Sequence, residues 1–523
     1  MLTRRSLGIQ SDVGALPIHP LLAAAYPVVF LFAANAAEQF SLDPLWVPLV
    51  LALVGTSLVL ALLWAATRDP YRAGLMTTVL VIGFFGYGHV WNAAADSLDS
   101  QWPFLIAWVL AIGILLFAAW RIPRPAARRV SRFVNVALLL LLVMNVWTLG
   151  TTMATAATAD DPLVADGVNV HLDPADADDV PDVYYIIPDR YGGLTALSEI
   201  YGHDNEPFLR ELEARGFNVA RHAHGNYMRT ISSLTSALSM DYLDAAELEA
   251  EAKHGSDWQP VFERFAGRLA VPAAFEELGY TYVHLGNWWQ PTATNVDADM
   301  TLKYEGQDEF RTAFAQTTLL RALTDPNAAP DDPWDWRSMR LGNIWSLDQL
   351  EQLPNVPGPK YVFAHLTITH EPYVHNEDGS FTGRDQVNEL GRTESYRRQL
   401  VYANTRLLDA VDSILAHDPE ALIVLMSDEG PFPDRYGAND KLDWPDATDM
   451  ELEQKSGILY ALRVPGADLE AEGFHDRITP VNAFRMVFNA RFGTDLPLLE
   501  DRTYFYRDVT ALYEWTDVTD RLP

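Results

Sequence analysis

The chain has 523 residues, with 70 acidic side chains against 38 basic ones and a formal net charge of −32. This excess of acidic residues argues against a protein that binds nucleic acid through a basic surface. The absence of cysteine excludes disulfides, thiolate metal sites and cysteine nucleophiles. The length predicts several domains, and a hydrophobic content of 49% predicts a folded chain.

The charge is divided unevenly along the chain. Residues 1–156 contain nine Arg and six acidic residues, a net charge of +3, so the remainder carries −35. Five apolar stretches in this first part have about the length needed to cross a bilayer. They run over residues 21–37, 46–66, 73–91, 103–120 and 133–153. We therefore expect a transmembrane domain of about five helices over residues 1–156.

The charged residues between these stretches predict the orientation in the cell membrane. Arg residues precede the first stretch and lie between the second and third and between the fourth and fifth: Arg4, Arg5, Arg68, Arg72, Arg121, Arg124, Arg128, Arg129 and Arg132. The alternate loops carry only acidic residues. Since basic loops stay in the cytoplasm, we expect a cytoplasmic N-terminus and an extracytoplasmic C-terminal half.

The second half begins with an acidic segment rich in Pro, Ala and Asp, residues 157–181, which we expect to be a linker. From residue 182 to 523 short apolar runs alternate with amphipathic segments. The runs are 183–189, 280–285, 361–367, 421–429 and 458–464, with a long helix expected near 391–417. This alternation predicts an α/β domain with a largely parallel sheet covered on both faces.

Polar residues follow several of these predicted strands. Asp189 ends the first, His370 follows the 361–367 strand, and Asp428 and Glu429 end the 421–429 strand. Thr230 lies where a loop runs into a predicted helix. Carboxylates gathered at one sheet edge repel each other unless a cation lies among them. A divalent metal there could lower the hydroxyl pKa and hold a phosphoryl or sulfuryl oxygen, with the threonine as nucleophile.

Motifs in the second half carry a resemblance to a known family. They are DVYYIIPDRYGG, YGHDNEPFLRELEARGFNVA, NYMRTISSLTSALSMDYL, HLTITHEPYV, LMSDEGPFP and ITPVNAFRMVFNARFG. Residues 182–517 resemble the alkaline phosphatase–sulfatase superfamily, in particular membrane-anchored sulfatase-like proteins akin to lipoteichoic acid synthases and phosphoethanolamine transferases. The resemblance implies that superfamily's α/β fold for the second half.

The resemblance also implies roles for individual residues. Asp189 resembles the metal ligand on the first strand, and Asp428 resembles the Asp of the Ser-Asp-His-Gly ligand motif. Thr230 occupies the position of the nucleophile, which also contacts the metal. His370 resembles the histidine that contacts the transferred group or the leaving oxygen. A weaker match places three consecutive residues in the substrate pocket: Asn287, Trp288 and Trp289.

The sequence departs from the family pattern at Glu429, where the usual residue is His. Glu can still bind a hard cation, and a set of oxygen ligands favours Mn²⁺ or Mg²⁺, with Ca²⁺ or Zn²⁺ also open. We expect one divalent metal, because no further histidine pair has a matching context. The same departure leaves open that catalysis is altered or lost.

Three functions remain after these observations. The leading one is a membrane-anchored, metal-dependent phosphotransferase or phosphodiesterase that acts on lipid-linked or envelope-glycan substrates. The second is a sulfatase or phosphatase acting on soluble esters. The third is a catalytically inactive sulfatase-like domain that serves as a binding or assembly component of the cell envelope. The expected partners are membrane lipids and the envelope substrate, without nucleic acid.

Overall fold

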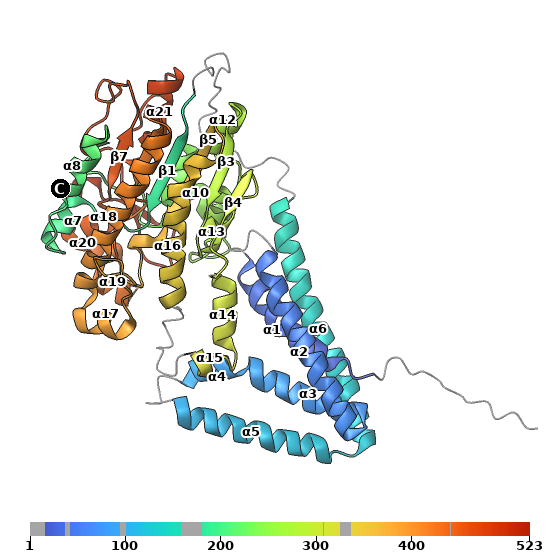
Figure 1. Cartoon of the computed structure of the whole chain (residues 1–523). Helices are drawn as coiled ribbons and strands as arrows, with labels where there is room; N and C mark the ends of the chain where they lie inside the picture. Colours follow the sequence, from blue (N-terminus) through green and yellow to red (C-terminus); the bar gives the residue numbers. More distant parts are fainter. Residues whose placement is uncertain are drawn as a thin grey trace, which may run out of the picture. The chain divides into compact units, whose positions relative to one another are not determined.

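The computed structural model describes residues 16–36, 42–94, 101–157, 180–306, 308–324, 336–439 and 441–523 (Figure 1). Contacts between residues divide the chain into two compact units. The first comprises Met1–Thr158 and Asp308–Pro333, and the second Ala159–Gln307 and Trp334–Pro523. Most of the predicted linker lies outside the described residues, as do Arg4 and Arg5. The loop charges that predict the orientation are therefore only partly described.

The helical unit is built from apolar helices of the N-terminal part. They are α1 (His19–Ala34), α2 (Asp43–Thr67), α3 (Pro70–Phe85), α4 (Tyr87–Ala94), α5 (Gln101–Arg121) and α6 (Arg124–Ala157). Asp69 caps α3, since its side chain accepts hydrogen bonds from the backbone N–H groups of Tyr71 and Arg72. Helices α1, α2, α3 and α6 pack against one another.

Several of these helices have the length and composition to cross a membrane. Among the described residues, α2, α5 and the Arg124–Thr151 part of α6 do so individually. Helices α3 and α4 meet at a bend of 44° and count as a fourth span if the pair is taken together. Helix α1 is apolar but has only 16 residues. Three or four of the five predicted spans are thus supported, and the fifth stays a prediction.

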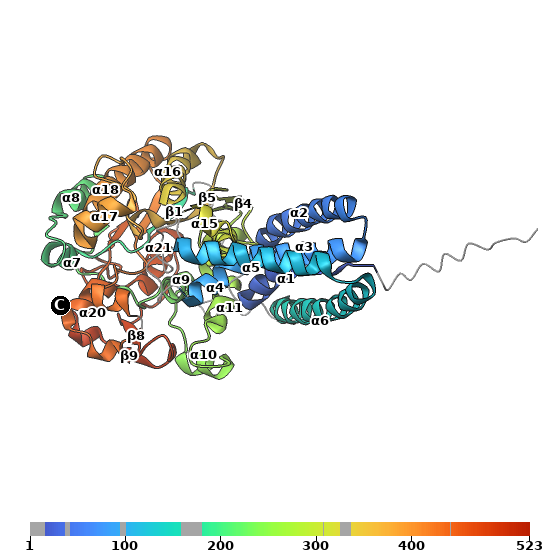
Figure 2. The same cartoon turned by 90° about the horizontal axis from the view of Figure 1, so that it is seen from below.

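A segment from the second half of the sequence belongs to the helical unit. It contains α14 (Glu309–Thr317), which contacts α4, and α15 (Arg321–Thr324), which lies next to α4 in Figure 1. Figure 2 shows α3 and α5 of the same unit side by side. The rings of Phe310 and Phe314, one helical turn apart, contact those of Phe32 and Phe85 at 5.1 and 5.6 Å between centroids. The sequence prediction had placed this whole segment within the 182–523 domain.

Polar contacts hold the same segment in the helical unit. The backbone N–H of Leu319 donates to the carbonyl oxygen of Phe84 at 2.8 Å. The Nη1 of Arg321 donates to the Oδ1 of Asn92 at 2.6 Å. The two Phe rings on α14 and the two hydrogen bonds that follow it therefore make the segment with α14 and α15 part of the helical unit.

The second unit is built on a seven-stranded sheet with the order β2-β7-β6-β1-β5-β3-β4. Its strands are β1 (Val183–Pro188), β2 (Asn218–Val219), β3 (Thr281–Leu285), β4 (Met300–Leu302), β5 (Lys360–Leu366), β6 (Leu422–Met426) and β7 (Tyr460–Arg463). A hairpin of β8 (Tyr504–Tyr506) and β9 (Trp515–Asp517) lies apart from this sheet. Strands β2, β4, β8 and β9 lie outside the apolar runs from which the strands were predicted.

The sheet is mixed. Strand β1 pairs in parallel with β5 and β6, and β3 pairs in parallel with β5 and β4. Strand β7 runs antiparallel to both of its neighbours, β6 and β2. The prediction of a largely parallel sheet did not include this reversal, because an apolar run carries no information on strand direction. The central strands β1, β5 and β6 are buried along their whole length, as expected of strands inside a parallel sheet.

Helices pack on both faces of this sheet. The helices of the unit are α7 (Leu194–Glu199), α8 (Glu206–Ala214), α9 (Thr230–Ser239), α10 (Ala245–Glu251), α11 (Gln259–Ala266), α12 (Ala270–Glu277), α13 (Gln290–Ala293), α16 (Trp336–Gln352), α17 (Arg384–Leu390), α18 (Arg392–His417), α19 (Asp434–Ala438), α20 (Asp449–Ser456) and α21 (Ala483–Phe492). Leu347 of α16 and Leu400 of α18 share one apolar core with Ile186 of β1. On the other face, Phe275 of α12 stacks on Tyr361 at 4.9 Å.

Candidate metal centre and active site

Two carboxylates meet at the carboxyl ends of β1 and β6. Asp189 directly follows β1, and Asp428 lies two residues beyond β6. Because these strands are parallel neighbours, their ends reach the same edge of the sheet. Both residues are buried, with exposed fractions of 4% and 2%. The structure thus brings together the two acids that the sequence predicted as metal ligands.

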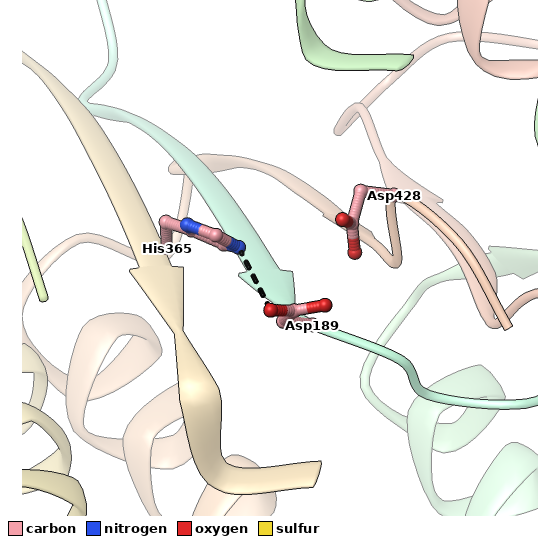
Figure 3. Close-up of side chains that lie close together, drawn as sticks. All are labelled: Asp189, His365 and Asp428. Carbon is pink, nitrogen blue, oxygen red and sulfur yellow. Dashed lines mark ion pairs between the residues drawn. The ribbon is translucent and has the colours of Figure 1, made fainter. Parts of the chain in front are cut away.

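A histidine that the sequence analysis did not select completes the cluster. His365 of β5 lies opposite Ile187 of β1, and its Nε2 is 3.6 Å from the Oδ2 of Asp189 (Figure 3). Asp189, His365 and Asp428 each offer one ligand atom, all within 4.8 Å of one another. His365 lies inside a strand rather than after one, so a search of strand ends overlooked it. Knowing that β1 and β5 pair in parallel would have placed His365 next to the end of β1, and the sequence alone does not show this pairing.

Three polar atoms of this cluster have no hydrogen-bond partner among the described residues. Asp189 Oδ1, Asp428 Oδ2 and His365 Nε2 are buried and have no hydrogen bond. Buried polar atoms without partners are rare, and each needs an explanation. A divalent cation among the carboxylates would provide one, so these residues fit a metal site.

Burial and repulsion between neighbouring carboxylates raise the pKa values of Asp189 and Asp428. Burial, and then the charge of Asp428, raises the pKa of Asp189 well above its usual value. Burial and the charge of Glu429 raise the pKa of Asp428 to about 6, although a hydrogen bond from Thr230 opposes this shift. A bound cation would favour the charged forms and reverse both shifts.

Thr230 lies at this cluster, as the sequence predicted. It is the first residue of α9 and is half-buried, and its side chain is hydrogen-bonded to the Asp428 carboxylate. The hydroxyl therefore has a proton acceptor next to it. This arrangement suits a threonine that attacks an ester held at the metal.

Glu429 has partners that the sequence did not anticipate. Its Oε1 lies 2.7 Å from the Nζ of Lys455 and 3.1 Å from the Nε of Arg190. Burial tends to raise the pKa of Glu429, but Lys455, Arg190 and Arg229 together hold it below its usual value. Its Oε2 is buried without a hydrogen bond from any described residue. Glu429 is thus ion-paired through Oε1, while its Oε2 has no hydrogen-bond partner among the described residues.

Three cations surround the ring of Phe432 next to this pair. Lys455 Nζ lies 3.7 Å from the ring centroid, and the guanidinium carbons of Arg190 and Arg229 lie 4.8 and 4.7 Å away. Arg190 also reaches Glu371, at 2.9 Å, and adopts a positive φ of 62°. Such strained backbone is common at functional sites. The cations supply positive charge beside Thr230, which would attract an anionic substrate group.

His370, predicted to contact the transferred group, lies just beyond β5. It is half-buried, its Nδ1 is hydrogen-bonded to the backbone oxygen of Glu371, and its ring meets that of Trp288 edge-on at 5.8 Å. Burial and then Arg190 lower the pKa of His370 well below its usual value. The imidazole is therefore neutral at pH 7.

The residues predicted to bind substrate lie behind and beside these histidines. Asn287 hydrogen-bonds His365 through its Nδ2, at 2.9 Å from Nδ1. Trp288 packs on His370, and the ring of Trp289 lies 6.3 Å from that of His365. All three are next to the candidate centre, and their contact with substrate stays a prediction.

Comparison with known proteins gives structural neighbours only. No family model matches the chain, and a search of curated proteins finds no match. The C-terminal periplasmic domain of EptC from Escherichia coli is 14% identical, with 68% of this chain and 97% of that chain covered and a TM-score of 0.43. The integral membrane lipooligosaccharide phosphoethanolamine transferase A (EptA) from Neisseria meningitidis is 13% identical, with 89% and 94% covered and a TM-score of 0.38.

A protein of the alkaline phosphatase superfamily from Vibrio parahaemolyticus is 10% identical, with 63% of this chain and 73% of that chain covered and a TM-score of 0.36. These solved structures belong to the same kinds of protein that the sequence motifs resemble. With identities and TM-scores this low, the reaction of this chain has to be inferred from its own residues.

Proposed function

We propose that the chain is a membrane-anchored, metal-dependent phosphotransferase or phosphodiesterase of the alkaline phosphatase–sulfatase type. The observation that carries this proposal is the buried carboxylate pair, Asp189 and Asp428, whose partnerless oxygens lie beside a threonine hydroxyl. A metal ion held there would polarise the phosphoryl group and stabilise the alkoxide form of the threonine. Glu429 Oε2 is a candidate further ligand.

The chemical step would begin at Thr230. Its hydroxyl oxygen forms a bond to phosphorus while the ester oxygen leaves with the bonding electron pair. The hydroxyl proton passes to the Asp428 carboxylate, to which Thr230 is hydrogen-bonded. The neutral ring of His370 donates its Nδ1–H to the backbone oxygen of Glu371, so its Nε2 is a proton acceptor near the same edge that could take the proton of the acceptor hydroxyl or water in the second step. The product is a phosphothreonine, which an acceptor hydroxyl or water then cleaves.

The substrate class follows from the anchor and the local charge. Apolar helices on the same chain would hold the site at a membrane surface, where a lipid-linked donor arrives by lateral diffusion. We infer five spans with α1 as the first, a cytoplasmic N-terminus and an extracytoplasmic catalytic unit. Lipid-linked or envelope-glycan phosphodiesters are therefore the proposed substrates, and Mn²⁺ or Mg²⁺ the proposed metal.

The proposal is tested by Thr230→Ala in the full-length protein. Turnover of lipid phosphodiesters should fall at least a thousandfold, because the nucleophile is lost, while Mn²⁺ binding and the melting temperature stay close to wild type. Thr235→Val is the matched control, since that hydroxyl lies on the same helix and only donates to the carbonyl of Ile231. Undiminished turnover in Thr230→Ala would contradict the mechanism.

The pairing of Glu429 with Lys455 and Arg190 keeps a second function open. A Glu tied to two cations could mark a site that has lost its reaction and serves in binding or envelope assembly. In that case no condition would give tight metal binding or turnover, and Thr230→Ala would leave the cell phenotype unchanged. A hydrolase acting on soluble sulfate or phosphate esters would instead turn over substrate without lipid.

A further inference from the structure

The three cations around the ring of Phe432 differ in how their charges are balanced. Lys455 and Arg190 both pair with the carboxylate of Glu429, at 2.7 and 3.1 Å. Arg229 forms no ion pair with a carboxylate in the part of the chain that the structure describes, and its contacts there are with aromatic side chains. Of the three cations, Arg229 is therefore the one whose charge no carboxylate partner balances.

The contacts of Arg229 fix the position of its guanidinium group and leave one side of it open. Its Nε donates a hydrogen bond to the hydroxyl oxygen of Tyr506 at 2.7 Å. Its guanidinium carbon lies 4.7 Å from the ring centroid of Phe432 and 5.7 Å from that of Tyr506. The two terminal nitrogens, Nη1 and Nη2, have no hydrogen bond to any described residue, and the side chain is half-buried. These two nitrogens are thus available to a ligand.

Arg229 is close to the candidate centre both in the sequence and in its electrostatic effect. It directly precedes Thr230 at the start of α9. Its charge is one of three that hold the pKa of Glu429 below its usual value against the effect of burial. Burial lowers the pKa of Lys455 to about 7 against the attraction of Glu429, and repulsion by Arg190 and Arg229 adds to this lowering. A bound anion would relieve the repulsion among these cations.

An open guanidinium group is well suited to binding a phosphoryl group. Its two terminal nitrogens form a planar fork that can donate hydrogen bonds to two oxygens at once. A phosphodiester has two nonbridging oxygens that share one negative charge, and one unbalanced guanidinium matches that charge. A cation on these oxygens would also stabilise the charge that they carry while the bond to Thr230 forms.

We propose that Arg229 binds the nonbridging oxygens of the transferred phosphoryl group through Nη1 and Nη2, and that Tyr506 positions it. Lys455 and Arg190 hold Glu429 instead of touching the substrate. The inference rests on the proposed function of the same site, and it names the residue that recognises the anionic part of the substrate.

Binding of inorganic phosphate to the full-length protein in the presence of Mn²⁺ tests this contact without turnover. Titration calorimetry should give a dissociation constant about 10- to 100-fold higher for Arg229→Met than for wild type, because charge-assisted hydrogen bonds are lost. Arg435→Met is the matched control and should bind phosphate like wild type. Arg435 also lies over a tyrosine ring, at 4.8 Å, but it pairs with Glu451 at 2.7 Å. A wild-type protein that binds no phosphate, or equal affinities in wild type and Arg229→Met, would overturn the proposal.

Two further variants separate charge and positioning from folding. Tyr506→Phe should weaken phosphate binding about three- to tenfold by itself and have no effect beside Arg229→Met, because Tyr506 acts through Arg229. Equal effects in both backgrounds would contradict its positioning role. Arg229→Lys keeps the charge without the fork and should weaken binding about tenfold. If Arg229→Met does not fold, Arg229→Lys decides, and a phosphate affinity equal to that of wild type would then overturn the proposal.

Turnover distinguishes this inference from the proposed function. With bis(p-nitrophenyl) phosphate as the diester, kcat/KM should fall about 10²- to 10³-fold in Arg229→Met. Added methylguanidinium should restore part of the activity of Arg229→Ala and none of that of Thr230→Ala. If wild type turns over the diester and Arg229→Met is equally active, the proposed function stands and this inference fails. If phosphate binding depends on Arg229 and no phosphodiester, soluble or lipid-linked, is turned over, this inference stands and the proposed catalysis fails.

Discussion

At the scale of single residues, the candidate centre concentrates charge in a buried place. Two carboxylates share it with a histidine, and a third carboxylate is balanced by Lys455 and Arg190. Isolated buried charges are costly unless they are paired or bind a metal. Each charge at this sheet edge therefore has a partner or an open ligand position.

The raised pKa of Asp428 gives a pH prediction for the metal-free protein. Its pKa in the folded chain is about 6 against an ordinary 3.8, so between these values the folded state holds a proton that the unfolded state releases. The contribution of Asp428 to the free energy of unfolding should therefore fall by about 2–3 kcal/mol as pH rises from about 4 to 6, and the raised pKa of Asp189 should continue the fall at higher pH. Thermal unfolding across pH 4–8 measures this.

Asp428→Asn is the control for this measurement: its side chain cannot titrate, so the slope between pH 4 and 6 should become smaller, and what remains comes from Asp189. Adding Mn²⁺ to the wild type should stabilise it increasingly as pH rises through 6, since the cation and the proton compete for the carboxylate. Stabilisation by Mn²⁺ that is constant across this pH range would contradict the assignment.

The buried pair of Glu429 and Lys455 gives a stability prediction. Lys455→Met leaves the carboxylate buried with one cation fewer, and the free energy of unfolding should drop by about 3–5 kcal/mol. The double variant with Glu429→Gln removes the stranded charge as well and should recover much of that loss. Urea unfolding of the four proteins in a double-mutant cycle measures the coupling, and simple additivity would show that the pair does not interact.

At the scale of secondary structure, the segment with α14 and α15 has the clearest consequence. Phe310 and Phe314 are buried only through their contacts within the helical unit. A fragment of residues 182–523 would leave these rings exposed to water, and exposed apolar patches promote association. We expect such a fragment to self-associate and to bind a hydrophobic dye, as measured by light scattering and dye fluorescence.

Phe310→Ser combined with Phe314→Ser should return that fragment to a monomer. The matched control is Phe262→Ser combined with Phe265→Ser on α11, whose rings belong to the second unit. The Phe262→Ser and Phe265→Ser double variant should destabilise the fragment, and the fragment should still self-associate. A monomeric unmodified fragment would contradict this reading of the segment.

At the scale of the whole molecule, the absence of cysteine makes the predicted topology easy to test. Pro123, between α5 and α6, and Ser256, in the second unit, are both exposed. The variants Pro123→Cys and Ser256→Cys would each carry the single cysteine of the chain, so no other residue would react with a thiol reagent. In intact cells a membrane-impermeant maleimide should label Ser256→Cys and spare Pro123→Cys, because Arg-rich loops stay in the cytoplasm. The orientation would be contradicted if neither variant were labelled until the cells were lysed, or if Pro123→Cys were labelled in intact cells and Ser256→Cys were not.

Much of this protein is determined by local sequence. Apolar length gives the helices of the first part, and apolar runs ending in Asp189 and Asp428 give two neighbouring strands with their acids at one edge. The start of α9 at Thr230 and the long helix α18 were also predicted, because helical periodicity is a local property of the sequence.

Other features were decided only by the tertiary structure, because they depend on which segments become neighbours. The direction of β7, the placement of α14 with the helical unit and the pairing of Glu429 with Lys455 join residues far apart in the sequence. The same holds for His365, which nothing in the strand's own sequence distinguishes. It reaches the carboxylates because β5 pairs with β1, and its ring is oriented by Asn287 from the end of a third strand.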